Sequence, residues 1–202
     1  HASAPPPRAR RTSGGRMGVA LAEEARKREA DVTLLAANLA VPAPAGVEVI
    51  WTPTAQAMLE AVLARADADL VLMAAAVADY RPREQLQDKR AKDDDAWQLT
   101  LEPTTDILRE LGARRENGQV LVGFAADHGQ RGLARAREKL AAKGVDLVVF
   151  NDVSRRDVGF DAADNEVVLV GPHGEQRIGK APKDQIAAAV VEKAEELLRE
   201  RA

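Results

Sequence analysis

The sequence contains no cysteine, few aromatic residues and no excess of positive charge. Without cysteine the chain can form neither a disulfide nor a thiolate metal site. Aromatic residues are only 3% of the chain, which leaves little material for the stacking surfaces that hold single-stranded nucleic acid. The formal net charge of −3 argues against a general nucleic-acid-binding protein, because such proteins carry a basic surplus. These absences exclude thiol chemistry and disfavour nucleic-acid binding.

Long hydrophobic runs are also missing from the sequence. No apolar stretch reaches the roughly 18 residues that span a membrane, and no signal-peptide core is evident. We therefore expect a cytoplasmic protein that binds neither membranes nor nucleic acid. The 202 residues are 46% hydrophobic, mostly Val, Leu, Ile and Ala, which is enough for the core of one large α/β domain.

Continuous apolar runs alternate with helical patterns along the chain. The runs are 31–37, 47–52, 69–76, 119–126 and 145–152, a half-exposed strand pattern covers 97–103, and helical patterns begin after Gly18 and cover 54–66, 104–115, 132–144 and 181–201. Such runs predict a mostly parallel sheet that is covered by helices on both faces. The turn sequence "GPHG" within 165–178 predicts an appended β-hairpin.

Ligands of a parallel α/β sheet bind at the carboxyl ends of its strands. Small residues follow two of the predicted strands, at Ala74–Ala76 and at Gly123. They either let a flat ring or a phosphate approach the backbone or permit tight packing of strands against helices. Asp79 comes shortly after the alanines and could bond a sugar hydroxyl or a base amino group, help to hold a metal, or cap a turn.

Lysines and glycines near these strand ends predict a phosphate-binding role. Lys139 and Lys143 lie one helical turn apart, so both could contact one phosphate group. Lys89 and Lys92 lie in a charged stretch that could reach over a site, although solvated lysines are the alternative for all four. The segment "SGGRMG" (13–18) could place a phosphate at a helix N-terminus. No His, Asp or Glu spacing predicts a metal site.

Six segments occur in the order, and at about the spacing, of one enzyme family. They are "SGGRMGVALAEEA", "AAAVADYRP", "DKRAK…LTLEPTTDIL", "LVGFAAD", "EKLAAKGVDLVVFNDV" and "GFDAADNEVVLV". Over roughly residues 13–200 the chain resembles phosphopantothenoylcysteine synthetase, the synthetase half of the bifunctional bacterial coenzyme A biosynthesis flavoprotein. Residues 13–202 are thus expected to be a nucleotide-binding synthetase domain, and residues 1–12 an arm that is disordered or derived from an expression vector.

The resemblance implies a Rossmann-like three-layer α/β fold and a homodimer. The implied reaction is a ligation in which CTP converts 4′-phosphopantothenate to an acyl-cytidylate and cysteine then displaces CMP; ATP in place of CTP stays open. Mg²⁺ is implied as the companion of the triphosphate, held mostly by substrate oxygens. The flavin-dependent decarboxylase half of the family's fusions lies outside these residues, so we expect no FMN here, although the chain could be fused to or assembled with such a decarboxylase.

The resemblance also assigns roles to individual residues. Lys89, from a mobile flap, takes a catalytic and nucleotide-binding role. Ser13, Gly14, Gly15 and Met17 take the phosphate of the substrate. The remaining nucleotide-binding positions fall on Ala75, Ala76, Asp79, Thr105, Asp106, Ile107, Leu108, Phe124, Lys139 and Lys143.

Two departures from the family pattern set limits on this expectation. The family has an asparagine that processes the acyl-nucleotide at about the position of Arg11, and no Asn precedes Asn38 here. The family also begins with a strand and a glycine-rich turn, which the stretch "HASAPPPRARR" does not resemble. The alternative is therefore a diverged or truncated, non-catalytic nucleotide-binding relative. A nicotinamide-dependent oxidoreductase is a weaker alternative, because the Gly-x-Gly-x-x-Gly fingerprint is missing.

Overall fold

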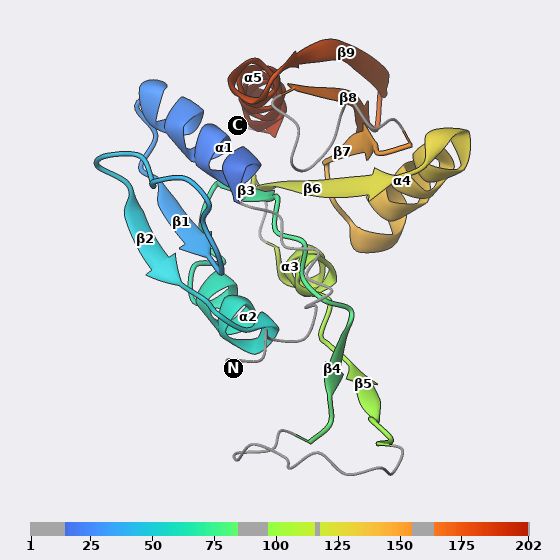
Figure 1. Cartoon of the computed structure of the whole chain (residues 1–202). Coiled ribbons are helices and arrows are strands. Elements are labelled where there is room, and N and C mark those ends of the chain that lie inside the picture. The colour runs from blue at the N-terminus through green and yellow to red at the C-terminus, as the bar shows by residue number, and fades with distance from the viewer. Residues whose placement is uncertain (1–14, 85–96, 116–117, 155–163, 202) are drawn as a thin grey trace, which may run out of the picture.

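The computed structural model describes residues 15–84, 97–115, 118–154 and 164–201. Helices and strands alternate along most of the chain (Figure 1). In chain order the elements are α1 (Arg16–Lys27), β1 (Thr33–Ala36), β2 (Glu48–Trp51), α2 (Ala55–Leu63), β3 (Leu70–Met73), β4 (Tyr80–Pro82), β5 (Leu101–Pro103), α3 (Ile107–Arg114), β6 (Val120–Asp127), α4 (Gly129–Lys143), β7 (Leu147–Asp152), β8 (Asp164–Gly171), β9 (Gly174–Pro182) and α5 (Lys183–Arg201).

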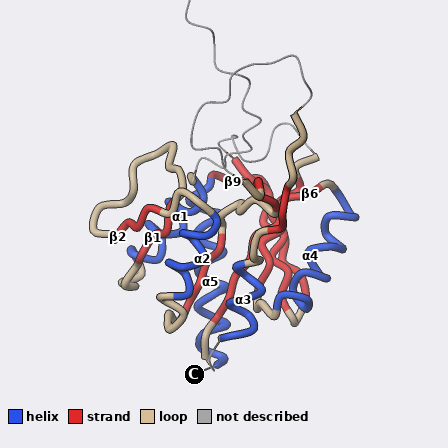
Figure 2. Tube along the Cα trace, turned by 90° about the horizontal axis from the view of Figure 1, so that it is seen from below, coloured by secondary structure: helices blue, strands red, loops and turns tan. Residues whose placement is uncertain are grey.

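The described strands form three separate hydrogen-bonded groups. The central sheet has the order β3-β6-β7-β8-β9, with β3, β6 and β7 parallel and β8 and β9 antiparallel. β1 and β2 form a parallel pair of their own, which lies beside the central sheet in both Figure 1 and Figure 2. β4 and β5 form a short antiparallel ribbon. The predicted sheet, mostly parallel with an appended hairpin, is confirmed.

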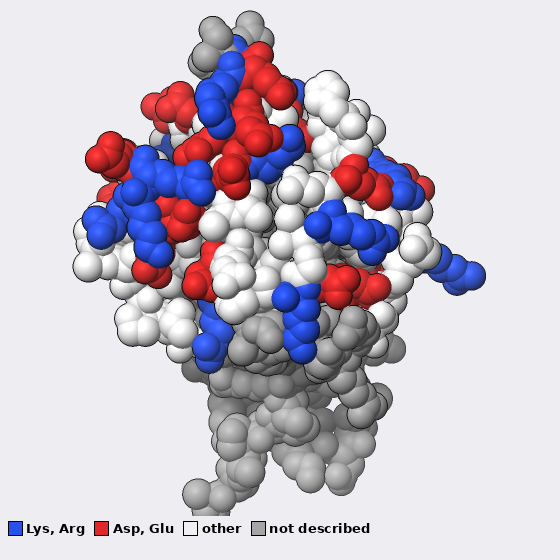
Figure 3. All heavy atoms as spheres, turned by 90° about the horizontal axis from the view of Figure 1, so that it is seen from above, with Lys and Arg blue, Asp and Glu red and all other residues white. Residues whose placement is uncertain are grey.

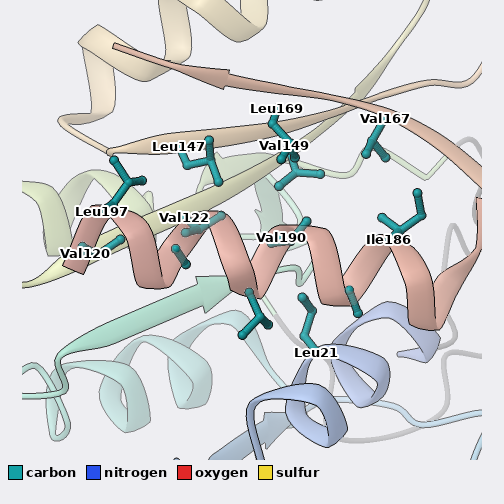
Figure 4. Packing of buried hydrophobic residues seen from close by; sticks show 13 residues of the cluster. Leu21, Val120, Val122, Leu147, Val149, Val167, Leu169, Ile186, Val190 and Leu197 are labelled. Atoms are coloured by element: carbon teal, nitrogen blue, oxygen red, sulfur yellow. The ribbon is translucent and has the colours of Figure 1, made fainter. Parts of the chain in front are cut away.

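Alternate residues of the central strands face two different layers of helices. Val120 and Val122 of β6 pack with Leu21 of α1 and Val190 of α5, as Figure 4 shows. Leu121, which lies between them in the sequence, packs on the opposite face with α3 and α4. All three β6 residues are fully buried, and burial of each such side chain contributes about 1.5–3 kcal/mol. The result is a three-layer fold in which the sheet is apolar on both faces.

Helix boundaries follow local chemistry, and one of them differs from the prediction. The hydroxyl of Thr54 accepts the N–H of Ala57 (3.0 Å) and caps α2, as its position before the helix predicts. Gly144 ends α4 in the left-handed conformation (φ 62°), which is also as predicted. The predicted cap of the helix at 104–115 by Thr104 or Thr105 is wrong, because α3 begins at Ile107 and its cap is Asp106.

Several other predicted boundaries are also corrected by the structure. The predicted strand 69–76 ends at Met73, and only 101–103 of the predicted strand 97–103 pairs in the β4–β5 ribbon. Two helices begin before their predicted starts, α1 at Arg16 and α4 at Gly129. Gly15 directly precedes α1, and Gly129 is the first residue of α4. Glycine has no apolar side chain, so the apolar pattern in the sequence starts later than the helix itself.

A cluster of charges anchors the last helix beneath the amino ends of the strands. The buried carboxylate of Asp146 accepts hydrogen bonds from Arg115 (2.9 Å to each oxygen), from Arg201 of α5 and from the backbone N–H of Leu121 (2.8 Å). Arg201 also donates to the carbonyl oxygen of Gln119 (2.6 Å). This Asp146 clamp joins α3, β6, β7 and α5 at the edge of the sheet opposite the strand ends discussed below.

The exposed surface carries both charge signs. On the face in Figure 3 acidic and basic side chains are interspersed and form no field of a single sign. Within the described ranges, no helix combines the length and apolar character needed to cross a membrane.

Candidate functional site

The site lies where β6 continues beyond its neighbour β3. The register of the two strands ends at the pair Met73–Gly123, and the remaining residues of β6 pair only with β7. One edge of the β6 backbone is therefore free of strand partners from Phe124 onward. The chain leaving β3 passes this edge through Ala75 and Ala76, both of which are exposed. Small side chains beside a free backbone edge leave space for a ligand to approach.

Lys139 of α4 points at this free edge. Its ammonium donates a hydrogen bond to the carbonyl oxygen of Phe124 (2.5 Å) and is partly buried. Burial lowers the pKa of Lys139 below its ordinary 10.5, and the charge of nearby Lys143 lowers it further. The carboxylates of Asp106 and Asp79 act in the opposite direction, so both lie close enough to Lys139 to influence it. The site thus concentrates two cations and two anions around one strand end.

Lys143 lies one turn further along α4 and forms an ion pair with Asp106. Asp106 also caps α3, since its side chain accepts the backbone N–H of Arg109 (3.1 Å). Burial alone would raise the pKa of Asp106, but the hydrogen bonds from Lys143 and Arg109 and the charges of the two lysines outweigh it. The net pKa is below the ordinary 3.8, so Asp106 is ionised at neutral pH. This carboxylate therefore connects the start of α3 to the end of α4.

Gly123 brings the first turn of α3 against the strand. A Cβ placed on Gly123 would lie 2.6 Å from Cδ2 of Leu108 and 3.8 Å from Cε of Lys139. Any larger residue would have to displace Leu108, which is buried. The glycine is thus needed for packing of α3 next to the lysine, which supports the packing interpretation of this residue, while the approach of a ligand to this strand end stays a prediction.

The turn after β3 is tied to the segment that enters α3. The hydroxyl of Thr104 donates to the carbonyl oxygen of Ala78 (2.5 Å), and its N–H donates to that of Asp79 (2.9 Å). These bonds explain why Thr104 does not cap the helix. They also place Asp79 and Thr105, whose side chains are exposed, beside Asp106.

The structure brings most of the predicted nucleotide-binding residues to one edge of the sheet. Ile107 and Leu108 are only 2% and 4% exposed, so they could contact a ligand through their backbone N–H groups alone. Sequence reasoning missed the ion pair across α3 and α4. A signal was available for the helix cap that Asp106 provides, because an Asp directly before an apolar helix is a strong N-cap pattern, but no local pattern marked the ion pair.

The predicted substrate-phosphate residues are placed only in part. Gly15 has a left-handed conformation (φ 67°) at the start of α1, where a Cβ would lie 2.8 Å from the carbonyl oxygen of Asn38. Met17 packs against the core cluster on the face of the sheet that α1 and α5 cover. Ser13, Gly14 and the flap residue Lys89 lie outside the described residues.

Two hollows elsewhere on the described surface do not include these lysines. One, of about 60 Å³, lies between the start of α4 and β7–β9, and is far smaller than the roughly 300 Å³ that a small-molecule site needs. The other is an open apolar hollow of about 580 Å³ lined by residues 39–43, Val49 and Trp51. No group of three or more His, Asp or Glu side chains within the described ranges is arranged to hold a metal ion.

Comparison with known proteins identifies the family. Residues 9–198 match the family described as DNA/pantothenate metabolism flavoprotein C-terminal domain. The coenzyme A biosynthesis bifunctional protein CoaBC of Vibrio vulnificus (strain YJ016) is 36% identical over 189 residues, which cover 92% of this chain and 47% of that protein. This chain thus spans about half the length of the curated relatives that it matches.

Solved structures give the same result. The crystal structure of the C-terminal domain of CoaBC is 30% identical with a TM-score of 0.78, and the match covers 96% of this chain and 89% of that one. A structure of a Cab2 mutant in complex with phosphopantothenate-cysteine shares the fold, with 15% identity, a TM-score of 0.71, and coverage of 93% and 80%. The family inferred from the six sequence segments is confirmed: this chain belongs to the DNA/pantothenate metabolism flavoprotein C-terminal domain family, together with the C-terminal domain of CoaBC.

Proposed function

We propose that this chain is a phosphopantothenate–cysteine ligase of coenzyme A biosynthesis that uses CTP. Family membership supports the pathway, as does the name of the CoaBC relatives. The observation that carries the nucleotide site is the bond of Lys139 to the carbonyl oxygen of Phe124 on the free backbone edge of β6, with Lys143 one helical turn away on Asp106. The phosphopantothenate-cysteine held by the Cab2 mutant, a protein of the same fold, supports the proposed product.

In this proposal the described residues bind and orient the triphosphate. Lys139 and Lys143 supply positive charge along the phosphates, and Lys143 exchanges its bond with Asp106 for a phosphate oxygen. The first N–H groups of α3, at Ile107 and Leu108, have no intrahelical partner and supply backbone donors. The exposed Ala75 and Ala76 provide the surface on which the base lies.

The proposed chemistry has two balanced steps. A carboxylate oxygen of 4′-phosphopantothenate attacks the α-phosphorus of CTP, and the bond to the β-phosphate oxygen breaks to release pyrophosphate. The amino nitrogen of cysteine then attacks the acyl carbon and loses a proton as the bond to CMP breaks. Mg²⁺ enters with CTP as part of the co-substrate, bound by triphosphate oxygens. The protein contributes fixed positive charge where negative charge develops.

A homodimer is part of the proposal, and the β4–β5 ribbon is the surface that supports it. Tyr80 is 61% exposed, and the alternating residues Trp97, Leu99 and Leu101 are 61%, 51% and 51% exposed. Large apolar side chains on this ribbon and on the segment that leads into β5 mark an interaction surface. A second copy of the chain fits this surface because the same apolar patch on both partners is self-complementary about a twofold axis.

Calorimetric titration of the chain with CTP and Mg²⁺ tests the nucleotide site. We expect CTP to bind, and Lys139→Ala to weaken binding about tenfold to hundredfold, the range for loss of one hydrogen bond to a charged group. Lys193→Ala is the matched control, because Lys193 pairs with Glu196 on α5, away from the site. Its affinity should equal that of the unchanged protein.

The outcomes separate the proposal from its alternatives. If CTP, UTP and ATP all fail to bind, the nucleotide site is refuted. If CTP binds but phosphopantothenate and cysteine are not joined, the chain is a nucleotide-binding relative without ligase activity. Equal losses from Lys139→Ala and Lys193→Ala would contradict the assignment of α4 as the phosphate-binding element.

A further inference from the structure

The two lysines of α4 that lie one helical turn apart are held by different partners. Lys143 forms an ion pair with the carboxylate of Asp106. Lys139 donates instead to the uncharged carbonyl oxygen of Phe124 (2.5 Å), and among the described residues it has no ion pair with a carboxylate. The two amines therefore differ in how firmly their charge is held.

Lys139 loses its proton more easily than a solvated lysine does. A Cβ on Gly123 would lie 3.8 Å from Cε of Lys139, so the lysine stem crosses β6 at its glycine. Burial lowers the pKa of Lys139 below its ordinary 10.5, and the charge of Lys143 lowers it further. The carboxylates of Asp106 and Asp79 offset this decrease only in part. Burial together with a neighbouring cation is one of the ways in which proteins activate a lysine as a nucleophile.

The Lys139 amine is held in place and is still open to a small reagent. The side chain is half-buried rather than enclosed. Its partner is the carbonyl of Phe124, on the edge of β6 that has no strand partner beyond Gly123. A neutral amine keeps this hydrogen bond, because it donates through one N–H while its lone pair stays free. Loss of the proton therefore does not release the side chain from the strand.

Lys143 adds an anion-binding group beside this nucleophile. Its side chain is 27% exposed, and a phosphate oxygen is an equivalent partner that can replace the carboxylate of Asp106. Attack of an amine on an acyl group is faster when the leaving group is stabilised as it takes up negative charge, which a fixed cation does for phosphate. The four-residue spacing places both lysines on one face of α4. A nucleophile and a binding group for its leaving group are thus neighbours.

We propose that Lys139 is a site of acylation by small acyl phosphates, with Lys143 binding the phosphate. The neutral amine nitrogen of Lys139 attacks the acyl carbon, and a nitrogen–carbon bond forms. The bond from that carbon to the phosphate oxygen breaks, and inorganic phosphate leaves with the electron pair. The proton lost by the nitrogen passes to the departing phosphate, so no oxidant or further reactant is needed.

Acylation removes one of the two cations at this strand end, because an acylated lysine carries no charge. The effect on nucleotide binding rests on the proposed function, whereas the acylation itself does not. The acetylated chain should bind CTP as weakly as Lys139→Gln, whose side chain is also uncharged. Normal CTP affinity after acetylation would contradict the assignment of Lys139 to the nucleotide site.

Acetyl phosphate is the probe, and peptide mapping by mass spectrometry is the measurement. Initial acetylation rates in the 202-residue chain are compared for Lys139, Lys193 and Lys27. Lys193 pairs with Glu196 and is 33% exposed, and Lys27 lies beside Glu23 and is 56% exposed. We expect Lys139 to react at least about tenfold faster than either, the low end of the contribution of one hydrogen bond to a charged group. Exposure alone would make Lys27 the fastest of the three.

Two comparisons separate phosphate binding from the reactivity of the amine. N-acetoxysuccinimide transfers the same acetyl group but carries no phosphate, so the advantage of Lys139 over Lys193 should shrink with this reagent. Methylphosphonate is an anion that cannot transfer an acyl group. It should slow acetylation of Lys139 by acetyl phosphate and leave the reaction with N-acetoxysuccinimide unchanged. Both comparisons use the unchanged protein.

Two variants should move the acetylation rate in opposite directions. Lys143→Gln removes the phosphate-binding charge, so acetyl phosphate should modify Lys139 about tenfold more slowly. Asp106→Asn releases Lys143 from its ion pair and keeps the cap of α3, so the same reaction should become faster. Circular dichroism at 222 nm checks that both variants are folded.

The inference is wrong if acetyl phosphate modifies Lys139 no faster than Lys193. It is also wrong if methylphosphonate gives no protection, or if folded Lys143→Gln reacts at the rate of the unchanged protein. None of these measurements requires CTP or ligase activity. A chain that is acetylated at Lys139 in the expected way but does not bind CTP would refute the proposed function and support this inference.

Discussion

Replacing Gly112 with alanine tests how closely α3 packs against the end of α4. Gly112 lies inside α3, where alanine is intrinsically favoured over glycine by about 1 kcal/mol. A Cβ at this position, however, would lie 2.1 Å from the carbonyl oxygen of Lys143. That distance is well inside the 3.0 Å that real Cβ contacts essentially never cross, and the obstacle is backbone. No side-chain rotation can relieve the overlap, so the two helices must separate.

The expected magnitude follows from these two opposing effects. Overpacking in a rigid environment costs about 1–3 kcal/mol, and the upper end applies because backbone must move. After the helix preference is subtracted, Gly112→Ala should lower the free energy of unfolding by about 2 kcal/mol. In a domain of this size that corresponds to a fall in the unfolding midpoint of roughly 4–8 °C. CTP affinity should fall as well, because the shift moves Lys143 away from Asp106.

Gly18→Ala is the matched control for this experiment. Gly18 lies in α1, and its added Cβ would meet only Cδ1 of Leu34 at 4.0 Å, an ordinary contact. The same chemical change should therefore stabilise the protein by about 0.5–1 kcal/mol. Thermal and urea unfolding, followed by circular dichroism at 222 nm, measure both variants. If Gly112→Ala is as stable as Gly18→Ala, the close approach of α3 to α4 is refuted.

Three further perturbations probe other parts of the molecule. Asp146→Ala leaves two arginines and the N–H of Leu121 without their buried partner, so urea unfolding should show a loss of about 3 kcal/mol, with CTP affinity of the folded protein unchanged. Asp106→Asn tests the lowered pKa of Asp106. The ionised carboxylate contributes stability that is complete above pH 3.8, its ordinary pKa, and that is lost as the pH falls through the lower pKa of the folded state. The variant should therefore lack this acid-dependent part of the unfolding free energy, while its asparagine preserves the helix cap. An unchanged acid dependence would contradict the Asp106–Lys143 pair. Leu101→Asp should convert the proposed homodimer to a monomer in light scattering, whereas Trp51→Ser, at a residue 62% exposed outside the ribbon, should not; a monomeric parent protein would refute the dimer.

The sequence alone predicts the elements whose signals are local. The cap at Thr54, the helix end at Gly144 and the "GPHG" hairpin each depend on a few neighbouring residues, and the structure confirms all three. The order of the elements and the three-layer arrangement follow from apolar runs that alternate with helical patterns. The lysine pair at Lys139 and Lys143 was predicted from its four-residue spacing, because that spacing places both side chains on one face of a helix.

Features that depend on distant residues could not be predicted in the same way. Thr104 has the chemistry of a helix cap, but its hydroxyl is taken by the carbonyl of Ala78, which lies 26 residues earlier. The ribbon strand Tyr80–Pro82 is short, contains proline and pairs with residues about 20 positions later, so no local pattern marks it. The ion pair of Asp106 with Lys143 likewise depends on how α3 crosses α4.

The Asp146 clamp has a consequence for how the chain folds during synthesis. Asp146 and its partners in α3 and β6 are made well before Arg201, the final residue of α5. Until Arg201 has left the ribosome, the carboxylate lacks one of its two arginines, and the apolar face of the sheet that α5 covers has no cover. The nascent sheet therefore stays incomplete until α5 has emerged, because α5 supplies both Arg201 and the apolar residues that cover this face. Ribosome-bound chains halted before residue 183 should accordingly remain sensitive to protease at the strands that α5 covers.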